Sequence, residues 1–177
     1  MRRDVKMGET SAPAAPAAKR RVYNLSESII SAISVGTVFI LFGLVYVLAF
    51  PANLFDRIVT FFGSLALRGI PGTGINLPAP INPGAHIVLY TAAFQFFIGL
   101  LLLQFLVLAL RILWKSPIRR TAESVGNLVF WAGSVFLANA FLNAHTTVNT
   151  WFAFWSGILI MIGLSLIARA LVLLAKR

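Results

Sequence analysis

The sequence predicts an all-α membrane protein: a four-transmembrane-helix bundle made of two helical hairpins, with an external interfacial amphipathic helix and a Pro/Gly-rich loop. Of the 177 residues, 59% are hydrophobic and only 11% are charged, whereas a soluble domain carries about 25% charged residues. Four stretches of 21 to 24 residues contain no charged side chain, which lets a helix cross a hydrocarbon core of about 30 Å. A soluble globular domain and a mainly disordered chain are therefore excluded.

The chain divides into a basic tail and a transmembrane domain. Residues 1–22 are rich in Ala, Pro, Lys and Arg, and with so few large apolar side chains we expect a disordered cytoplasmic tail. Residues 23–177 form the transmembrane domain, in which Asn24 or Ser26 is expected to cap the first helix. The predicted spans are 29–50, 87–110, 124–144 and 146–168. These spans lack the apolar/polar alternation of a membrane β-barrel, so we expect helices.

Residues 53–85 form the external segment between the first two spans. Apolar residues recur at helical spacing over residues 53–70, which predicts an amphipathic helix. Two positions for this helix stay open, in the membrane interface or packed on the bundle. Residues 69–85 contain four glycines and four prolines. This composition excludes a helix and a central strand, and it indicates an ordered loop that is the first place to look for an external docking surface.

The lysine and arginine residues predict the orientation in the membrane. Thirteen of the 15 lie on the side that holds both termini and the link between spans two and three, and only Arg57 and Arg68 lie on the other side. Both termini are therefore predicted to be cytoplasmic, and the absence of a cleavable signal or organelle-targeting pattern indicates the cell membrane. This distribution explains the net charge of +10, so we expect no nucleic-acid partner. Lipid headgroup contacts are expected from Arg20, Arg21, Arg119 and Arg120.

The two predicted hairpins resemble each other in sequence. Spans one and three each open with a glutamate and a serine soon after an Arg-Arg pair, and segments 36–39 and 133–136 are similar. In spans two and four a glycine precedes an arginine by 12 residues: Gly99 and Arg111 in one, Gly157 and Arg169 in the other. An internal duplication would relate the hairpins as parallel repeats. Chance similarity between leucine-rich helices is the alternative, and the sequence leaves both open.

The spans carry few groups that support chemistry. All five acidic residues lie outside them: Asp4, Glu9, Glu27, Asp56 and Glu123. An ion-coupled carrier usually has a carboxylate or a paired charge at membrane depth, and the spans lack that feature. A serine nucleophile needs a nearby base and an orienting acid, which the sequence does not indicate for any serine. We therefore predict that the chain is not an enzyme.

Two histidines are the candidate cofactor ligands. His86 is predicted at the outer end of span two and His145 in the turn between spans three and four, so both lie on the external side. A neutral imidazole binds haem iron or a transition metal, which makes a shared site one hypothesis. No Cys, Met or carboxylate lies near either histidine in the sequence to complete a small metal site. We therefore predict no cofactor and two interfacial histidines.

Polar and small residues inside the spans predict helix packing. Gln95 and Gln104 are nine positions apart and so face opposite sides of span two, whereas Asn139 and Asn143 share one face of span three. These asparagines either line a polar vestibule or hydrogen-bond within the bundle, and we favour the second interpretation. Such hydrogen bonds contribute roughly 0.6–2 kcal/mol in membranes. Small residues four apart predict close helix approach: Ala32 with Gly36, and Ser134 with Ala138.

Three functions remain open from the sequence. We favour a non-catalytic accessory or structural subunit of a larger membrane complex, with the lipid bilayer and other membrane protein subunits as partners. The reason is that the spans contain no charged residue and that the sequence indicates neither a set of cofactor ligands nor a soluble domain. The second is a small membrane carrier or channel, monomeric or homo-oligomeric, with Gln95, Asn139 and Asn143 near its path. The third is a haem-binding electron-transfer subunit that uses His86 and His145.

Overall fold

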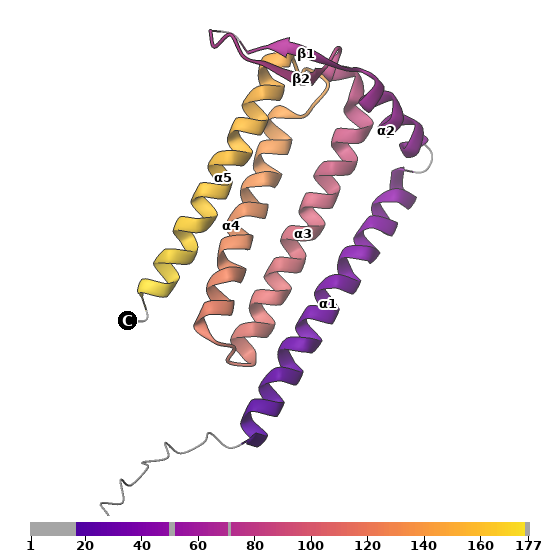
Figure 1. The fold of residues 1–177 in the computed structure, drawn as a ribbon. Helices are drawn as coiled ribbons and strands as arrows, with labels where there is room; N and C mark the ends of the chain where they lie inside the picture. Colours follow the sequence, from indigo (N-terminus) through magenta and orange to yellow (C-terminus); the bar gives the residue numbers. More distant parts are fainter. Residues whose placement is uncertain (1–16, 50–51, 71, 176–177) are drawn as a thin grey trace, which may run out of the picture.

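Four long helices cross the molecule in alternating directions (Figure 1). The computed structural model describes residues 17–49, 52–70 and 72–175, with side chains from residue 27 onward. The long helices are α1 (Ala17–Ala49), α3 (Ile87–Leu113), α4 (Ile118–Phe141) and α5 (Val148–Leu174). All four are long and apolar enough to cross a membrane. The predicted fold class, an all-α protein with four membrane-spanning helices, is confirmed.

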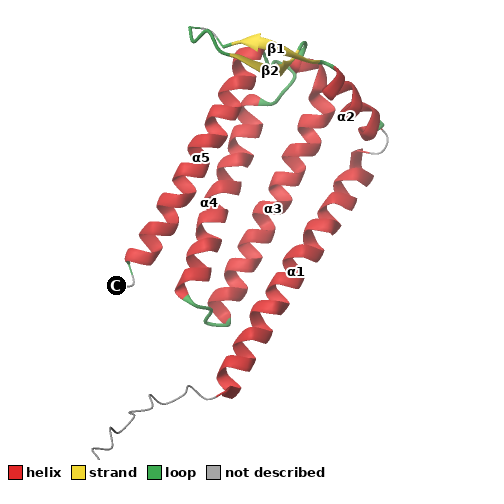
Figure 2. Cartoon of the chain, in the orientation of Figure 1, coloured by secondary structure: helices red, strands yellow, loops and turns green. Residues whose placement is uncertain are grey.

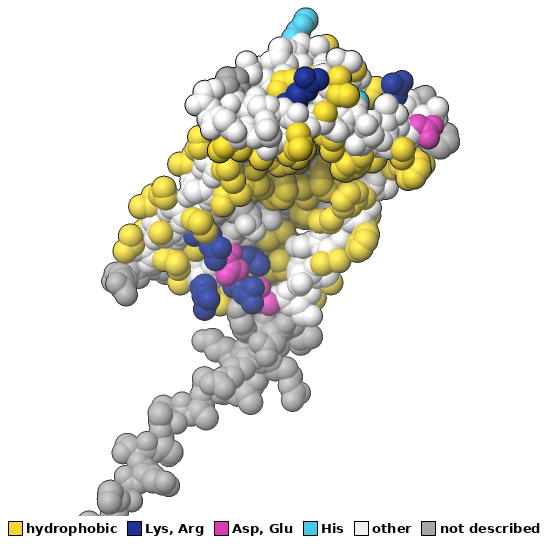
Figure 3. All heavy atoms as spheres, turned by 45° about the horizontal axis from the view of Figure 1, so that its top comes forward, with side chains coloured by type: hydrophobic (Ala, Val, Ile, Leu, Met, Phe, Trp, Pro, Cys, Tyr) yellow, Lys and Arg dark blue, Asp and Glu magenta, His cyan; other side chains and the backbone are white. Residues whose placement is uncertain are grey.

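The long helices form a row in the order α1, α3, α4, α5, and their extensive contacts join neighbours in that order (Figure 1). Consequently α3 and α4 each pack on two long helices, whereas α1 and α5 lie at the two edges. More acidic and basic side chains lie at one end of the row than at the other (Figure 3). We call this the basic end, which holds Glu27, residues 111–124 and Arg169. The opposite end, with residues 52–86 and 142–147, is called the hairpin end.

The first helix begins earlier than the sequence predicts. Because α1 starts at Ala17, Asn24 and Ser26 lie within the helix, and the prediction that one of them caps it is wrong. Residues 17–22, expected in the disordered tail, are helical. Alanine, lysine and arginine are good helix formers, which explains the extension beyond the apolar span. The rest of the predicted tail, residues 1–16, lies outside the described residues.

Helix α2 (Leu54–Gly63) is shorter than the predicted helix over residues 53–70. Asn53 precedes it in the left-handed conformation, with φ of 51°, which asparagine tolerates better than most residues. Ser64 closes it by donating its hydroxyl to the carbonyl oxygen of Phe61 (2.8 Å). Leu54 is buried, and Phe61 packs beside Trp151 with ring centroids 5.7 Å apart. One side of α2 therefore packs on the bundle, and the other side stays exposed.

A two-stranded antiparallel sheet follows α2 (Figure 2). Strand β1 (Leu65–Gly69) pairs with β2 (Asn76–Pro80), with Leu67 opposite Pro78 and Leu65 opposite Pro80. This pairing is not predicted from the sequence, because prolines remove backbone donors from a strand. They are tolerated here since both strands of a two-stranded sheet are edges. Gly72 and Gly74 have φ of 78° and 67° in the turn, a conformation that glycine adopts readily.

The connection between α4 and α5 occupies residues 142–147, which include the predicted turn. Helix α4 therefore ends at Phe141, before residue 144, where the third predicted span ends. Thr146 lies with its hydroxyl 2.7 Å from the carbonyl oxygen of Phe141 at the end of α4. Thr147 and Thr150 then form a reciprocal capping box at the start of α5. Each threonine hydroxyl accepts the backbone N–H of the other residue, which satisfies two donors that a helix start leaves free.

Glycines permit the closest helix contacts, but not all at the predicted positions. A β-carbon at Gly126 would meet the backbone of Ser165 on α5, so α4 and α5 approach closely there. Ser134 and Ala138 of α4 are buried as well. The expectation for α1 differs from the structure: Ala32 and Gly36 are exposed, and a β-carbon at Gly36 would have no neighbour within 4 Å. The physical reason is that α1 turns its opposite face, which includes Ile30 and Leu41, toward α3.

Replacing Gly126 by alanine tests the close contact between α4 and α5. The added carbon would lie 2.8 Å from the backbone oxygen of Ser165, and relieving this overlap should cost about 1–3 kcal/mol. Gly163→Ala is the matched control, since nothing lies within 4 Å of that position, and there alanine should stabilise the helix by up to about 1 kcal/mol. Thermal unfolding in mild detergent, followed by tryptophan fluorescence, gives the comparison. A Gly126→Ala protein that melts as high as Gly163→Ala would contradict the packing described.

Candidate functional site

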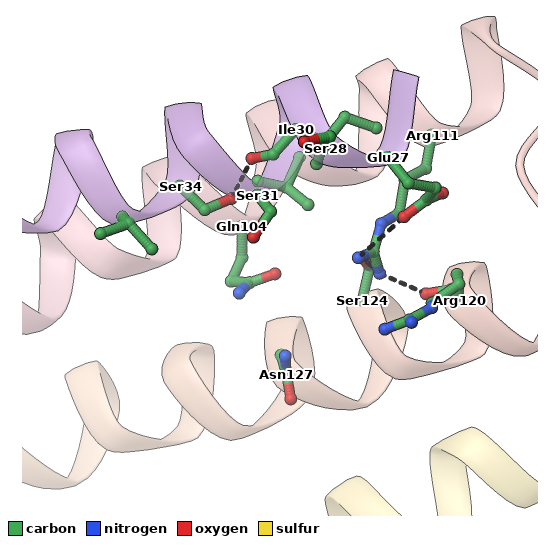
Figure 4. A pocket seen from close by; sticks show the side chains of 12 residues that line it. Glu27, Ser28, Ile30, Ser31, Ser34, Gln104, Arg111, Arg120, Ser124 and Asn127 are labelled. Carbon is green, nitrogen blue, oxygen red and sulfur yellow. Dashed lines mark hydrogen bonds and ion pairs between the residues drawn. The ribbon is translucent and has the colours of Figure 1, made fainter. Parts of the chain in front are cut away.

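A polar groove opens at the basic end, between α1 and α4, with α3 behind them (Figure 4). Its volume is about 460 Å³. Unlike the apolar flanks of the row, the groove is lined largely by hydroxyl, amide and charged groups. The lining residues are Glu27, Ser28, Ile30, Ser31, Ser34 and Val35 of α1, Gln104, Val107 and Arg111 of α3, and Arg120, Ser124 and Asn127 of α4.

The guanidinium group of Arg111 joins three helices in this groove (Figure 4). Its Nη1 donates to the backbone oxygen of Arg120 (2.5 Å) and to Oγ of Ser124 (2.7 Å), both on α4. Its Nη2 lies 3.9 Å from Oε2 of Glu27 on α1. The side chains of Arg111 and Glu27 are only 14% and 17% exposed, so solvent screens them less than a surface pair. Arg111 therefore ties α1, α3 and α4 together.

The end of α3 positions these groups. Lys115 adopts the left-handed conformation, with φ of 49°. The N–H groups of Lys115 and Ser116 donate to the carbonyl oxygens of Ile112 (3.1 Å) and Arg111 (2.9 Å), respectively. This Schellman arrangement ends the helix and turns the chain toward α4. The Ser116 hydroxyl then donates to Oε1 of Glu27 (2.8 Å), so the Glu27 carboxylate has a partner at each oxygen.

Two buried polar atoms of the groove have no partner among the described residues: Nε of Arg111 and Oε1 of Gln104. Gln104 lies seven residues before Arg111 on the same face of α3, about 10 Å along the helix axis. Leaving a buried polar atom without a hydrogen bond costs about 1–3 kcal/mol. Both atoms lie beneath the lining of the groove, so a polar side chain has to enter the groove to reach either of them, and two separate groups are needed to satisfy both.

A second cluster of charges repeats part of this arrangement in the other hairpin. Nη2 of Arg169 on α5 lies 3.5 Å from Oε1 of Glu123 on α4, and Nη1 of Arg120 lies 3.5 Å from Oε2 of the same carboxylate. In both hairpins the glutamate belongs to the first long helix and the arginine to the end of the second. The Arg169 side chain is 39% exposed, because in the described chain no further helix covers it as α4 covers Arg111.

The close contacts at glycine match between the hairpins as well. Gly99 of α3 packs against Leu41 of α1, and Gly157 of α5 packs against Leu137 of α4. Each leucine lies 14 residues after the paired glutamate, and each glycine lies 12 residues before the paired arginine. The same two contacts at the same spacings favour internal duplication over chance similarity. The similarity between segments 36–39 and 133–136 differs from this register by one residue, because Gly36 follows Glu27 by nine residues and Gly133 follows Glu123 by ten.

The two histidines have different surroundings. Nε2 of His86 lies 3.1 Å from Oγ of Ser64, and the imidazole ring contacts Phe61 and Tyr90 edge-on. His145 is exposed in the α4–α5 connection. Within the described part of the chain, no cluster of three or more His, Cys, Asp or Glu residues could hold a metal ion. The turn before His86 packs on the α4–α5 connection, since a β-carbon at Gly84 would meet the backbone of Ala144, and the haem hypothesis stays a prediction.

The polar residues of the spans lie on separate surfaces. Gln104 belongs to the groove, whereas Gln95 lines a small pocket of about 210 Å³ between α1 and α3 at the hairpin end. Asn139 is exposed on α4. Asn143, in the α4–α5 connection, accepts the backbone N–H of His145 through Oδ1 (2.8 Å). The path that the carrier hypothesis places beside Gln95, Asn139 and Asn143 is therefore not formed by these residues within one chain.

The arginines expected at the lipid headgroups have different surroundings. Arg119 is exposed at the first turn of α4. Arg120 is also exposed, but its backbone oxygen accepts a hydrogen bond from Arg111. The side chains of Arg20 and Arg21 lie outside the described part of the structure. Arg120 thus contributes its backbone oxygen to the groove. The type of its side chain gives no indication of this role.

Comparisons with known proteins identify no family for this chain. No protein-family model, no curated protein and no solved structure matches it. The function is therefore inferred from the chemistry of the polar groove itself, which combines hydroxyl, amide, carboxylate and guanidinium groups.

The centre of the groove is not predicted from the sequence. There, Arg111 is one of thirteen basic residues that mark topology, and Gln104 is a packing residue. The signal that points to Arg111 is the repeated Gly–Arg spacing taken together with the glutamate at the start of each hairpin, since this pattern predicts one ion pair per hairpin. This pattern does not predict the contact of Arg111 with Ser124, because that contact depends on which helices are neighbours in the row.

Replacing Arg111 by methionine should destabilise the protein, since methionine keeps an apolar stem but loses the contacts with α1 and α4. Hydrogen bonds to a charged group contribute about 1.5–3 kcal/mol, and we expect the free energy of unfolding to fall by about that amount. Arg119→Met makes the same chemical change at an exposed site, where the expected change is within about 0.5 kcal/mol. Denaturant titrations in detergent measure both values. Equal losses in the two variants would show that Arg111 has no special structural role.

Proposed function

We propose that this chain is a non-catalytic structural subunit of a membrane protein complex, and that a partner helix covers the polar groove. The observation that carries the proposal is the pair of buried atoms without hydrogen-bond partners, Nε of Arg111 and Oε1 of Gln104. Lipid chains offer no hydrogen bonds, whereas a polar residue on an adjacent helix does. Because both atoms are buried, the partner satisfies them only with polar side chains that enter the groove.

The edges of the row support the same proposal. Helix α1 packs extensively on one long helix, α3, and α5 packs on one, α4. On α1, the small residues Ala32, Gly36 and Gly43 fall within about 40° of one another and point away from the Ile30 face. A β-carbon at Gly36 or Gly43 would meet nothing within 4 Å. Small residues on an exposed transmembrane face permit close approach of another helix, so α1 can accept partners on more than one side.

The proposal also includes the location of the complex. The excess of lysine and arginine at the ends of the chain and in the α3–α4 connection favours a cytoplasmic position for the basic end and both termini. The polar groove would then face the cytoplasmic half of the cell membrane.

Purification of the tagged chain from its native membrane in mild detergent tests this proposal. We expect a complex that is larger than one 19.3 kDa chain and contains stoichiometric companions or further copies. Ser31→Leu should weaken the complex, because Ser31 is exposed and lines the groove, and a larger apolar side chain would occupy the space of the partner. Size-exclusion chromatography with mass determination, followed by protein identification, measures the outcome.

The matched control is Ala153→Leu, which places the same apolar side chain on an exposed position of α5 outside the groove. It should leave the complex intact. Both variants should keep the melting temperature of the original chain, since neither position is buried. A wild-type chain that leaves the membrane as a single 19.3 kDa species would contradict the proposal, as would equal behaviour of the two leucine variants.

A further inference from the structure

The contact between the two hairpins provides a template for a contact between two chains. Helix α3 of the first hairpin packs on α4 of the second. At the basic end Arg111 donates to Ser124, and toward the middle of the helices Phe97 packs on Trp131 with ring centroids 5.9 Å apart. Between these contacts, Gln104 of α3 lies in the polar groove. Phe97, Gln104 and Arg111 are spaced by seven residues, so they lie along one face of α3.

Helix α5 carries an equivalent face that the described chain leaves uncovered. A shift of 58 positions, which relates Gly99 to Gly157, maps the three residues of α3 onto Trp155, Ile162 and Arg169. Trp155 is 50% exposed and Ile162 is 44% exposed, and the Arg169 side chain is 39% exposed. The equivalent residues of α3 are less exposed, and the Arg111 side chain is only 14% exposed. The end of the row at α5 is thus a second copy of the surface that binds α4.

Helix α1 carries the complementary face at the other edge of the row. A shift of 96 positions, which relates Glu27 to Glu123, maps Ser124, Asn127 and Trp131 of α4 onto residues of α1. The equivalent residues are Ser28, Ser31 and Val35, all of which are exposed and line the polar groove. Ser28 has the same hydroxyl as Ser124, the acceptor of Arg111. The two uncovered edges therefore correspond to the two halves of the α3–α4 contact.

We propose that copies of this chain associate head-to-tail, with α5 of one copy packed on α1 of the next as α3 packs on α4. Arg169 then donates to Ser28 of the next copy, and Trp155 packs on Val35. The inference rests on the proposed function, because it identifies the partner at the groove as a second copy of the same chain. The incoming α5 covers the α1 wall of the groove.

The membrane geometry permits this association. Helices α3 and α4 are antiparallel within one membrane (Figure 1), and α5 is antiparallel to α1 of a neighbour when both copies have the same orientation. The two surfaces differ, so the interface is heterologous and forms a ring when the rotation closes. The rotation axis then lies along the membrane normal, as for parallel repeats within a chain. Continuing the row across chains therefore requires no inverted copy.

Cysteine cross-linking in native membranes tests the proposal, and no native thiol of this chain competes, because its sequence contains no cysteine. Ser31→Cys is placed in one tagged chain and Ile162→Cys in a second chain with a different tag, and both are expressed together. Mild oxidation forms a disulfide only when the β-carbons approach to about 3.5–4.5 Å, and a short bis-maleimide extends this range. The expected result is a covalent dimer that carries both tags.

Two controls make the cross-linking specific. Gln104→Cys with Asn127→Cys in one chain is the equivalent pair at the α3–α4 contact, so its cross-link within the chain confirms that the reaction works at this geometry. Ile160→Cys replaces Ile162→Cys as the negative control, since Ile160 is 61% exposed but lies about 160° around the helix. The dimer should be lost with Ile160→Cys.

Head-to-tail association is overturned if the Gln104–Asn127 control forms and the Ser31–Ile162 dimer does not. It is also overturned if Ser31→Cys alone gives the dominant dimer, because identical faces would then meet. A chain that still purifies with other subunits but gives no Ser31–Ile162 product retains the proposed function and loses this partner. A chain that is a single species in mild detergent and gives no product contradicts both proposals.

Discussion

The contact of Arg111 with Glu27, Ser124 and the backbone of Arg120 is the interaction on which the arrangement of the two hairpins depends. Transmembrane helices gain little from mutual apolar contact, since lipid chains are equally apolar. A guanidinium group near the membrane boundary supplies what apolar packing lacks, a directional interaction. It sets the height of α1 relative to α3 and joins both to the start of α4. The glycine contacts then determine how closely the helices approach.

The architecture follows from the sequence wherever lipid is the only constraint. The four apolar spans, the interruption between the third and fourth spans, and the amphipathic character of α2 all follow from residue type alone. The helix and strand boundaries that differ from the prediction are those set by particular hydrogen bonds. The hydroxyl of Ser64 ends α2, and β1 and β2 pair across a glycine turn. Composition could not indicate that pairing, because prolines usually argue against strands.

The candidate site was less predictable for a different reason. Its residues come from three helices, and which helices are neighbours is a property of the row rather than of any one segment. Arg111 and Gln104 could be placed on one face of α3 from their spacing, but their approach to Ser124 and Glu27 required the helix order. The small residues Ala32 and Gly36 show the converse case. Their spacing predicts close approach of a helix, yet spacing carries no information on whether that helix belongs to the same chain.

The hairpin of β1 and β2 has a consequence for the behaviour of neighbouring molecules. Both of its strands are edges, and an open edge is normally a template on which another chain can add a strand. Strand β2 contains Pro78 and Pro80 within five residues, so two of its positions have no backbone N–H to donate. An incoming strand would find an interrupted ladder there. The prolines make this hairpin hard to predict from the sequence. They also protect it against β-sheet growth between molecules that are crowded in the same membrane.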